Sequence, residues 1–248
     1  MNTWILLRGL TRETAHWGDF PGTLAHALHE SQVVPLELPG NGTLRAMPSP
    51  TRVADMASFC HQEAARLGLR PPYHLLALSM GGMVAAAWAS AHPDEIAALV
   101  MINTSFGSFS PLHHRLRPGA WATLARILVN PDAWRRERLI FELTSSLPQR
   151  SRESVLEAWT AIRLARPVHP LNVARQVFAS ARFRAPLSAP ARALVLAGSG
   201  DRLVDPRCSR TIAQRWSCPL AIHPTAGHDL PLDDGPWVAL QIRNWMSP

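Results

Sequence analysis

Three residues of the kinds used in nucleophilic catalysis stand in the order Ser79, Asp201, His228, and each lies close to a glycine. A serine hydroxyl is a poor nucleophile at neutral pH, but it becomes reactive when a histidine takes its proton. An aspartate that orients the imidazole and stabilises its charged form completes such a group. These residue types predict chemistry through a covalent intermediate, provided that the fold brings the three side chains together.

The surroundings of Ser79 favour this chemistry. The stretch "LLALSMGGMVAAAW" (residues 75–88) has no charged residue and changes at Ser79 from a strand pattern to a run of small residues. A serine in a tight turn from strand to helix projects its hydroxyl above the sheet, and the turn needs very small residues two positions before and after it. Ala77 and Gly81 occupy those positions. The alternative role for Ser79 is an ordinary helix N-cap.

Alternating apolar runs and helical patterns predict the elements that position these residues. The short apolar runs predict strands, the second of which runs into a Pro/Gly turn, at residues 3–9, 32–42, 73–79, 96–105, 191–199 and 219–225. Helical patterns follow at residues 16–30, 52–68, 80–93, 206–217 and 235–246. Strands that alternate with helices indicate an α/β protein whose sheet is mostly parallel, has about six strands and is covered on both faces.

Residues 107–185 break this alternation. The strand signal disappears there, and Trp, Leu, Ala and Arg recur at helical spacing between prolines. The pattern predicts about four helices. We therefore expect a core in two parts, residues 1–106 and 186–248, with a helical cap at 107–185 inserted after the fourth strand.

The predicted topology gives a spatial test of the three candidate residues. In open parallel sheets, ligands bind outside the carboxyl ends of the strands. Residues 8–10 follow the first predicted strand, Ser79 the third, Asp201 the fifth and His228 the sixth. We expect these residues to converge at one edge of the sheet.

At these residues the chain resembles the α/β-hydrolase family, and the resemblance covers nearly all of the sequence. It is most similar to compact, cap-bearing carboxylesterases of the pimeloyl-carrier-protein methyl ester esterase type. The family pattern G-x-S-x-G corresponds to residues 77–81, with Ala77 in place of the first glycine. The family's His-Gly pair corresponds to Arg8-Gly9. Further family turns correspond to "LELPGNG", "GSGDRLVDP" and "AGHDLPLDD".

The resemblance implies a role for each candidate residue. Ser79 would be the nucleophile, His228 the base and Asp201 the residue that orients the histidine. The backbone amides of Leu10 and Met80 would form the oxyanion hole. The resemblance implies neither a metal nor an organic cofactor.

Some assignments have competitors nearby. Asp205 precedes Pro206 and is an alternative to Asp201, although a helix cap would explain it equally well. His16 is a candidate for lining a substrate pocket. Trp17 matches an aromatic position of the family and suits packing better than chemistry.

The positive charge of the chain is concentrated in the predicted cap. All basic residues are arginines, and residues 107–185 hold 13 of them against 5 acidic residues. A cationic cap would suit an acyl chain carried by an acidic acyl carrier protein, or a substrate with a free carboxylate. A solvated surface in an arginine-biased sequence is the simpler explanation. No nucleic-acid-binding motif accompanies the charge.

Cysteine usage and hydropathy indicate a cytoplasmic protein without a membrane span. Cys60, Cys208 and Cys218 cannot all pair and show no metal-ligand spacing. The N-terminal "MNTWILLRGL" lacks the pattern of a secretion signal. Residues 71–93 carry no formal charge, but their prolines and glycine pair fit a strand followed by a helix better than a span.

The sequence thus predicts a serine hydrolase that cleaves a carboxylic ester or thioester through an acyl-enzyme. Carbon–carbon bond hydrolysis and acyl transfer are alternatives on the same residues, because a fold does not fix a function. A catalytically silent binding protein on the same scaffold is an alternative of another class. The departures at Arg8 and Ala77 leave room for it.

Overall fold

The computed structural model describes residues 2–29 and 31–247, and it confirms the predicted α/β fold. In this part of the chain six strands form one sheet in the order β2-β1-β3-β4-β5-β6, and every neighbouring pair is parallel. The strands are β1 (Asn2–Leu7), β2 (Ser31–Leu36), β3 (Tyr73–Leu78), β4 (Ile96–Ile102), β5 (Ala193–Gly198) and β6 (Leu220–His223).

The central strands are apolar because both of their faces are covered. All six residues of β3 are buried, and so are all six of β5. Successive side chains of a strand point to opposite faces of the sheet. Leu75 and Ala77 accordingly join the apolar cluster on one face, and Leu76 and Leu78 join the cluster on the other.

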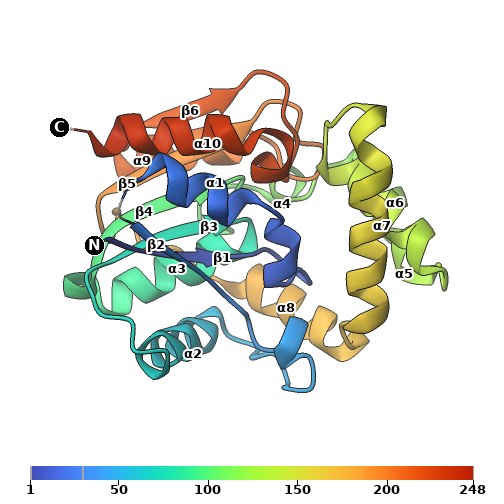
Figure 1. Cartoon of the computed structure of the whole chain (residues 1–248), viewed down its shortest axis with the longest axis horizontal. Helices are drawn as coiled ribbons and strands as arrows, with labels where there is room; N and C mark the ends of the chain where they lie inside the picture. Colours follow the sequence, from blue (N-terminus) through green and yellow to red (C-terminus); the bar gives the residue numbers. More distant parts are fainter. Residues whose placement is uncertain (1, 30, 248) are drawn as a thin grey trace.

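Helices outside the cap cover the two faces of the sheet (Figure 1). α1 and α10 pack together over one face, and α2 and α3 pack together over the other. α9 contributes Ile212 and Trp216 to the same cluster as α2 and α3. The bounds are α1 (Phe20–Ala27), α2 (Val53–Arg66), α3 (Met80–Ala91), α9 (Arg207–Trp216) and α10 (Leu230–Met246), with short 3-10 helices η1 (Thr14–Trp17), η2 (Gly42–Leu44) and η3 (Pro93–Glu95).

Two predicted helices differ from the observed ones. The pattern at residues 16–30 is split into η1 and α1, because Gly18 lies between them at φ 52° and ends the first helical turn. Glu30 lies outside the described residues. The last helix begins at Leu230 rather than at residue 235, and it is interrupted at Asp234, whose φ of −154° is not helical.

The helices between β4 and β5 fall within residues 107–185, the range expected for the cap. They are α4 (Leu112–Arg115), α5 (Pro118–Val129), α6 (Ala133–Thr144), α7 (Gln149–Ala165) and α8 (Pro170–Arg182). About four helices were expected here, and the additional one is the short α4. Phe141, Leu156 and Trp159 form a small apolar core between α6 and α7. α5, α6 and α7 stand at the end of the sheet where the strands terminate (Figure 1).

Among the described residues, no helix combines the length and the apolar character that crossing a membrane requires.

Candidate active site

Ser79 occupies a strained turn between β3 and α3. Its backbone lies at φ 57° and ψ −119°, outside the regions that a serine readily adopts. Two hydrogen bonds hold the turn in place: the Ser79 N–H donates to the carbonyl of Ile102 at 2.9 Å, and the Thr104 hydroxyl donates to the carbonyl of Ser79 at 3.1 Å. Ser79 itself is partly exposed.

Glycines surround Ser79 because neighbouring backbone and side-chain atoms approach too closely for a further side chain. A Cβ added to Gly81 would lie 2.4 Å from the carbonyl oxygen of Leu7, and one added to Gly82 would lie 2.1 Å from Oγ1 of Thr104. A Cβ on Gly9 would lie 3.1 Å from Cβ of Ser79. The loop after β1 therefore runs directly beside the serine.

The structure brings His228 and Asp201 together. Nδ1 of His228 donates to Oδ2 of Asp201 at 2.7 Å, and the two side chains are 7% and 1% exposed. The other carboxylate oxygen of Asp201 accepts from the backbone N–H groups of Leu203 and Val204 at 2.8 and 2.9 Å. This arrangement fixes the ring so that Nε2 is the nitrogen left to accept a proton.

No hydrogen bond joins Ser79 to His228 within residues 2–29 and 31–247. Hydrogen bonds between nucleophile and base are often long or poorly aligned when no substrate is bound. The shared placement of both residues at the carboxyl edge of the sheet is what the topology predicts.

Asp205, the competitor of Asp201, has a different set of contacts. Its carboxylate accepts from the backbone N–H of Arg207 at 2.9 Å and forms an ion pair with the same residue's guanidinium at 2.7 Å. The bond to the Arg207 side chain lowers the pKa of Asp205 to about 2, although burial opposes the shift. Asp205 thus stabilises the start of α9, while Asp201 contacts the histidine.

The charges around His228 favour its protonated form. Burial lowers the pKa of the imidazole, but the negative charge of Asp201, the hydrogen bond to it and the charge of Asp229 together outweigh burial. The positive charge of Arg8 opposes them. The net result is a pKa above the usual value for a histidine.

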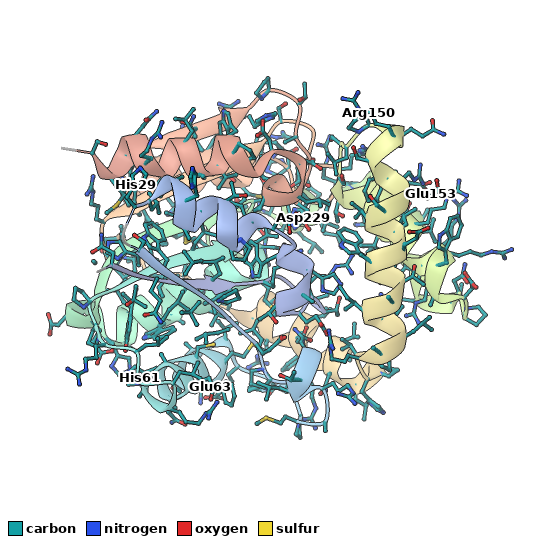
Figure 2. All side chains as sticks on the ribbon, in the orientation of Figure 1. His29, His61, Glu63, Arg150, Glu153 and Asp229 are labelled. Carbon is teal, nitrogen blue, oxygen red and sulfur yellow. The ribbon has the colours of Figure 1, made fainter. Side chains whose placement is uncertain are left out.

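Arg8 and Asp229 form a buried ion pair beside this histidine. Nη1 and Nη2 of Arg8 donate to the two carboxylate oxygens of Asp229 at 3.1 and 2.6 Å. Their side chains are 2% and 4% exposed, and the Arg8 guanidinium lies 4.7 Å from the centre of the Trp17 ring. The pair ties the loop after β1 to the residue that follows His228. Asp229 is labelled in Figure 2, close to the cap-facing end of the sheet.

Sequence reasoning did not assign a role to Asp229 or to Asn103. Asn103 donates from Nδ2 to the carbonyls of Gly227 and His228 at 3.0 and 2.8 Å, and its Oδ1 accepts from the N–H of Gly198 at 3.0 Å. It therefore joins the ends of β4, β5 and β6. The only hint in the sequence was that Asn103 lies at the end of a predicted strand, where the site was expected.

The two amides expected to form the oxyanion hole belong to the residue after Gly9 and the residue after Ser79. Leu10 follows Gly9, and Met80 is the first residue of α3. Within the described ranges neither amide donates a hydrogen bond. The first N–H groups of a helix lack partners within the helix and favour negative charge. Among the described residues, both N–H groups therefore lack a protein acceptor.

The two predicted pocket residues are buried at the junction of core and cap. His16 lies edge-on to Trp159 of α7, with 5.9 Å between ring centroids. Burial, together with the charges of Arg12 and Arg8, holds the pKa of His16 well below its usual value, so the ring is neutral. Trp17 stacks on Phe20 and is 3% exposed, which is a packing position.

An open cavity of about 550 Å³ is lined by Asp201 and lies between the cap and the loop after β5. Its walls include Arg117, Glu142 and Arg202 but neither Ser79 nor His228. This hollow is therefore next to the candidate triad rather than over its reactive atoms.

The chain belongs to the alpha/beta hydrolase family, whose sequence pattern matches residues 5–240. A segment of 100 residues, 40% of the chain, is 31% identical to the monoacylglycerol lipase abhd6-B of Xenopus laevis. That segment covers 29% of the lipase, so the chain matches less than a third of the length of this curated relative.

Solved structures with different activities share the fold. An esterase of Thermogutta terrifontis has a TM-score of 0.77 and 23% identity, covering 99% of this chain and 89% of its own. The enol-lactonase of Burkholderia xenovorans LB400 has a TM-score of 0.77 and 16% identity, covering 100% and 92%. At these identities the likeness establishes the fold alone. None of these matches singles out the methyl ester esterase type.

Proposed function

We propose that the protein is a serine hydrolase that cleaves a carboxylic ester or thioester through an acyl-enzyme, with Ser79, His228 and Asp201 as its triad. The observation that carries the proposal is the buried contact of 2.7 Å between His228 and Asp201 at the strand edge where the strained Ser79 turn also lies. Membership of the alpha/beta hydrolase family and the esterase and lipase relatives support the reaction class.

In the proposed mechanism, Oγ of Ser79 attacks the carbonyl carbon while Nε2 of His228 takes the hydroxyl proton. The carbonyl oxygen becomes an oxyanion that accepts hydrogen bonds from the amides of Leu10 and Met80. His228 then gives its proton to the departing alcohol or thiol, which leaves an acyl group on Ser79. A water molecule, deprotonated by His228, attacks this ester, and the acid and the free serine are regenerated.

The experiment that tests the proposal is intact-protein mass spectrometry after treatment with a fluorophosphonate. We expect one phosphonyl adduct on the wild-type protein and none on Ser79→Ala. A well-folded wild-type protein that gains no adduct would contradict the proposal and favour a silent binding protein.

Asp201 and Asp205 provide a matched pair of variants. Asp201→Asn should lower kcat by about 10⁴-fold, as in other triads where the histidine takes the wrong tautomer. Asp205→Asn removes a carboxylate four residues away and should leave kcat within a few fold, since Asp205 contacts Arg207 instead. Equal losses in both variants would remove Asp201 from the triad.

To identify the natural ester, hydrolysis rates are measured for p-nitrophenyl esters of increasing acyl length. They are compared with the rates for methyl esters and thioesters of the same acids. Fast cleavage of a methyl ester would support the methyl ester esterase type that the sequence resembles. Turnover restricted to a diketone substrate, or transfer to an added alcohol, would favour carbon–carbon hydrolysis or acyl transfer on the same triad.

An acidic acyl carrier protein is the macromolecular partner that the arginine-rich cap would suit, although a solvated surface is the simpler explanation of its charge. Four cap arginines are already engaged in ion pairs, Arg138 and Arg152 with Glu142, Arg163 with Glu137 and Arg166 with Glu13. The remaining positive charge is the part available to a partner.

We place the protein in the cytoplasm on the basis of its thiols. All three cysteines are free, and Cys60 and Cys208 are buried. Burial raises the pKa of Cys60 to about 12 and that of Cys208 to about 11, which makes both thiols unreactive. Secretion of the active protein in cell fractionation would contradict this location.

A further inference from the structure

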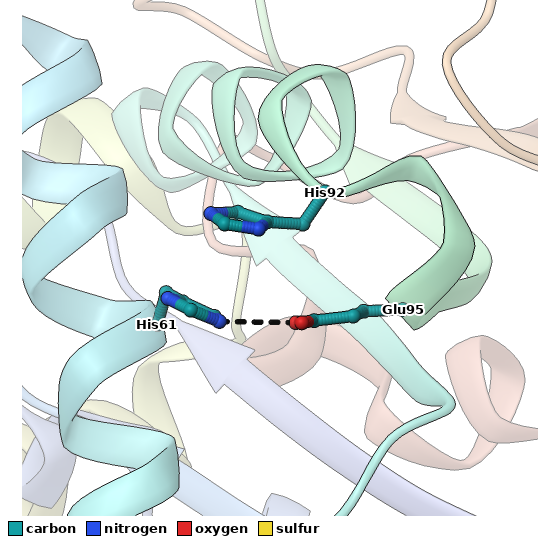
Figure 3. A group of neighbouring side chains, drawn as sticks. All are labelled: His61, His92 and Glu95. Carbon is teal, nitrogen blue, oxygen red and sulfur yellow. Dashed lines mark ion pairs between the residues drawn. The ribbon is translucent and has the colours of Figure 1, made fainter.

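Two histidines and a glutamate meet at the amino end of β4, whereas the candidate triad lies at the carboxyl ends of the strands. His61 lies on α2, His92 caps the C-terminus of α3, and Glu95 ends η3 (Figure 3). η3 leads directly into the first residue of β4, whereas Ser79 follows the last residue of β3. Figure 2 shows His61 far from the cap. The cluster therefore has no part in the proposed ester hydrolysis.

The contacts within the cluster leave Oε2 of Glu95 without a hydrogen-bond donor among the described residues. Nε2 of His61 is 3.1 Å from Oε2 of Glu95, the pair joined in Figure 3. This approach lacks the geometry of a hydrogen bond, and Oε2 is a buried atom with no hydrogen-bond donor in the described part of the chain. One ring nitrogen of each histidine and a carboxylate oxygen of Glu95 all lie within 4.8 Å of one another.

Packing holds both rings beside the glutamate. The imidazoles of His61 and His92 stack with their centroids 3.9 Å apart, and the ring of Trp88 lies edge-on to His61 with 6.0 Å between centroids. α2 and α3 pack against each other, which holds the backbone that carries the two rings. The side chains of His61 and Glu95 are 29% and 31% exposed, which leaves the cluster accessible to an ion from solution.

These distances approach those of a tetrahedral zinc site. Ligands at about 2.0–2.1 Å from Zn²⁺ lie about 3.3 Å from one another. The contact between His61 and Glu95 is already near this value. The two rings are stacked, and the three ligand atoms lie within 4.8 Å of one another. His92 must therefore rotate to bring a ring nitrogen to the separation that a tetrahedral ion requires. A partly exposed side chain at the end of a helix has room for that rotation.

We propose that His61, His92 and Glu95 bind a divalent transition-metal ion, with Zn²⁺ as the ion that this ligand set favours and water as the fourth ligand. The ion would link α2 to the connection between α3 and β4. Its effect would be to stabilise the native state, because the three ligands come together only when the chain is folded.

The test begins with full-length protein stripped of metal with EDTA. We expect isothermal titration with ZnCl₂ to give one ion per chain, and CoCl₂ to give the intense visible absorption of tetrahedral cobalt. At a free Zn²⁺ concentration 100 times the Kd, the folding equilibrium constant should rise about 100-fold, which a higher Tm would report. An absence of binding up to millimolar metal would overturn the proposal.

Single variants locate the ion. His61→Gln, His92→Gln and Glu95→Gln should each weaken Zn²⁺ binding at least 10-fold, while the fluorophosphonate adduct on Ser79 still forms. His26→Gln and His29→Gln are matched controls from α1 and the turn after it: both residues are exposed, with ring centroids 6.3 Å apart. Binding that persists in the cluster variants, or that is lost equally in the controls, would assign the ion to other residues. A simple ion pair between His61 and Glu95 would then be the remaining explanation.

Discussion

At the scale of single residues, the turn at Ser79 shows why small neighbours are needed. A residue held outside the favourable backbone regions costs about 1–3 kcal/mol. The surrounding structure compensates through the hydrogen bonds to Ile102 and Thr104 and through the close approach of Gly81 to the carbonyl of Leu7. The strain therefore exists because β1, β3 and α3 meet at one point.

Gly81→Ala tests this crowding. The added methyl group would lie 2.4 Å from a backbone oxygen that cannot move without shifting β1. We expect the free energy of unfolding in urea to fall by about 3 kcal/mol and esterase activity to fall with it. Ala77→Gly, at the matching position before the serine, should lower stability by only about 1 kcal/mol. Equal stability of Gly81→Ala and wild type would contradict the tight turn.

Asp229→Asn tests the charges that act on His228. The histidine must be neutral to take the serine proton, so activity is lost as the pH falls through its pKa, which lies above the usual value. Asp229 raises this pKa and Arg8 lowers it. Removing the Asp229 charge while Arg8 stays should therefore move the acidic limb of the kcat/KM profile to lower pH. The profile is measured with a p-nitrophenyl ester.

A second variant separates this shift from a loss of folding. Asp229→Asn leaves a buried arginine without its partner, which is strongly destabilising, whereas replacing both members of such a pair by apolar residues is often tolerated. The double variant Arg8→Met/Asp229→Leu should shift the limb in the same direction but by less, because the effect of Asp229 on the histidine exceeds that of Arg8. An unchanged limb in a folded variant would mean that the pair is only structural.

At the scale of elements, local patterns were sufficient for the strands but not for the helix ends. The apolar runs predicted each strand, because burial on both faces leaves a continuous signal in the sequence. The split at Gly18 and the early start of α10 at Leu230 were missed, since both depend on how the chain turns next to the site. Contacts such as Asn103 with Gly227, 124 positions apart, have no local signal.

Buried ion pairs connect the cap to the loop that carries Leu10. Glu137 of α6 accepts from Arg12 at 2.8 Å and pairs with Arg163 of α7, while Glu13 pairs with Arg166. Glu137 is 1% exposed and Arg12 is 10% exposed. The position of the cap is thus coupled to the backbone two residues after the proposed oxyanion donor.

Glu137→Gln tests this coupling. The substitution leaves the Arg12 charge buried without compensation, so the free energy of unfolding should fall by about 3 kcal/mol. Hydrogen exchange should become faster in α6 than in the sheet, because the bond between cap and core is lost. Glu157→Gln, on an exposed position of α7, is the matched control and should change neither measurement. Uniformly faster exchange throughout the chain would argue against a local connection.

At the scale of the whole molecule, the contact between His228 and Asp201 could be anticipated from the sequence, and the substrate could not. The proposed triad was inferred from three turns at strand ends, which local sequence encodes together with the order of the strands. The substrate depends on surfaces of the cap and on pairs such as Arg8 with Asp229, whose members are 221 positions apart. The influence of the cap charge on substrate choice should therefore be visible in kcat/KM.

The excess of arginine in residues 107–185, 13 against 5 acidic residues, creates a positive field that ion pairs inside the cap do not cancel. Long-range attraction acts on association and is screened by salt, with a Debye length of about 10 Å at 0.1 M and about 3 Å at 1 M. We therefore expect kcat/KM for a p-nitrophenyl ester with a free carboxylate to fall several-fold over this range of NaCl. The value for a neutral ester of equal length should stay within about two-fold, because a neutral substrate is not attracted by the field. An acyl group on an acidic carrier protein should behave like the anionic ester, with a steeper fall. Equal salt dependence for both small esters would show that the cap arginines serve packing and solvation, and the carrier protein would lose its basis as a partner.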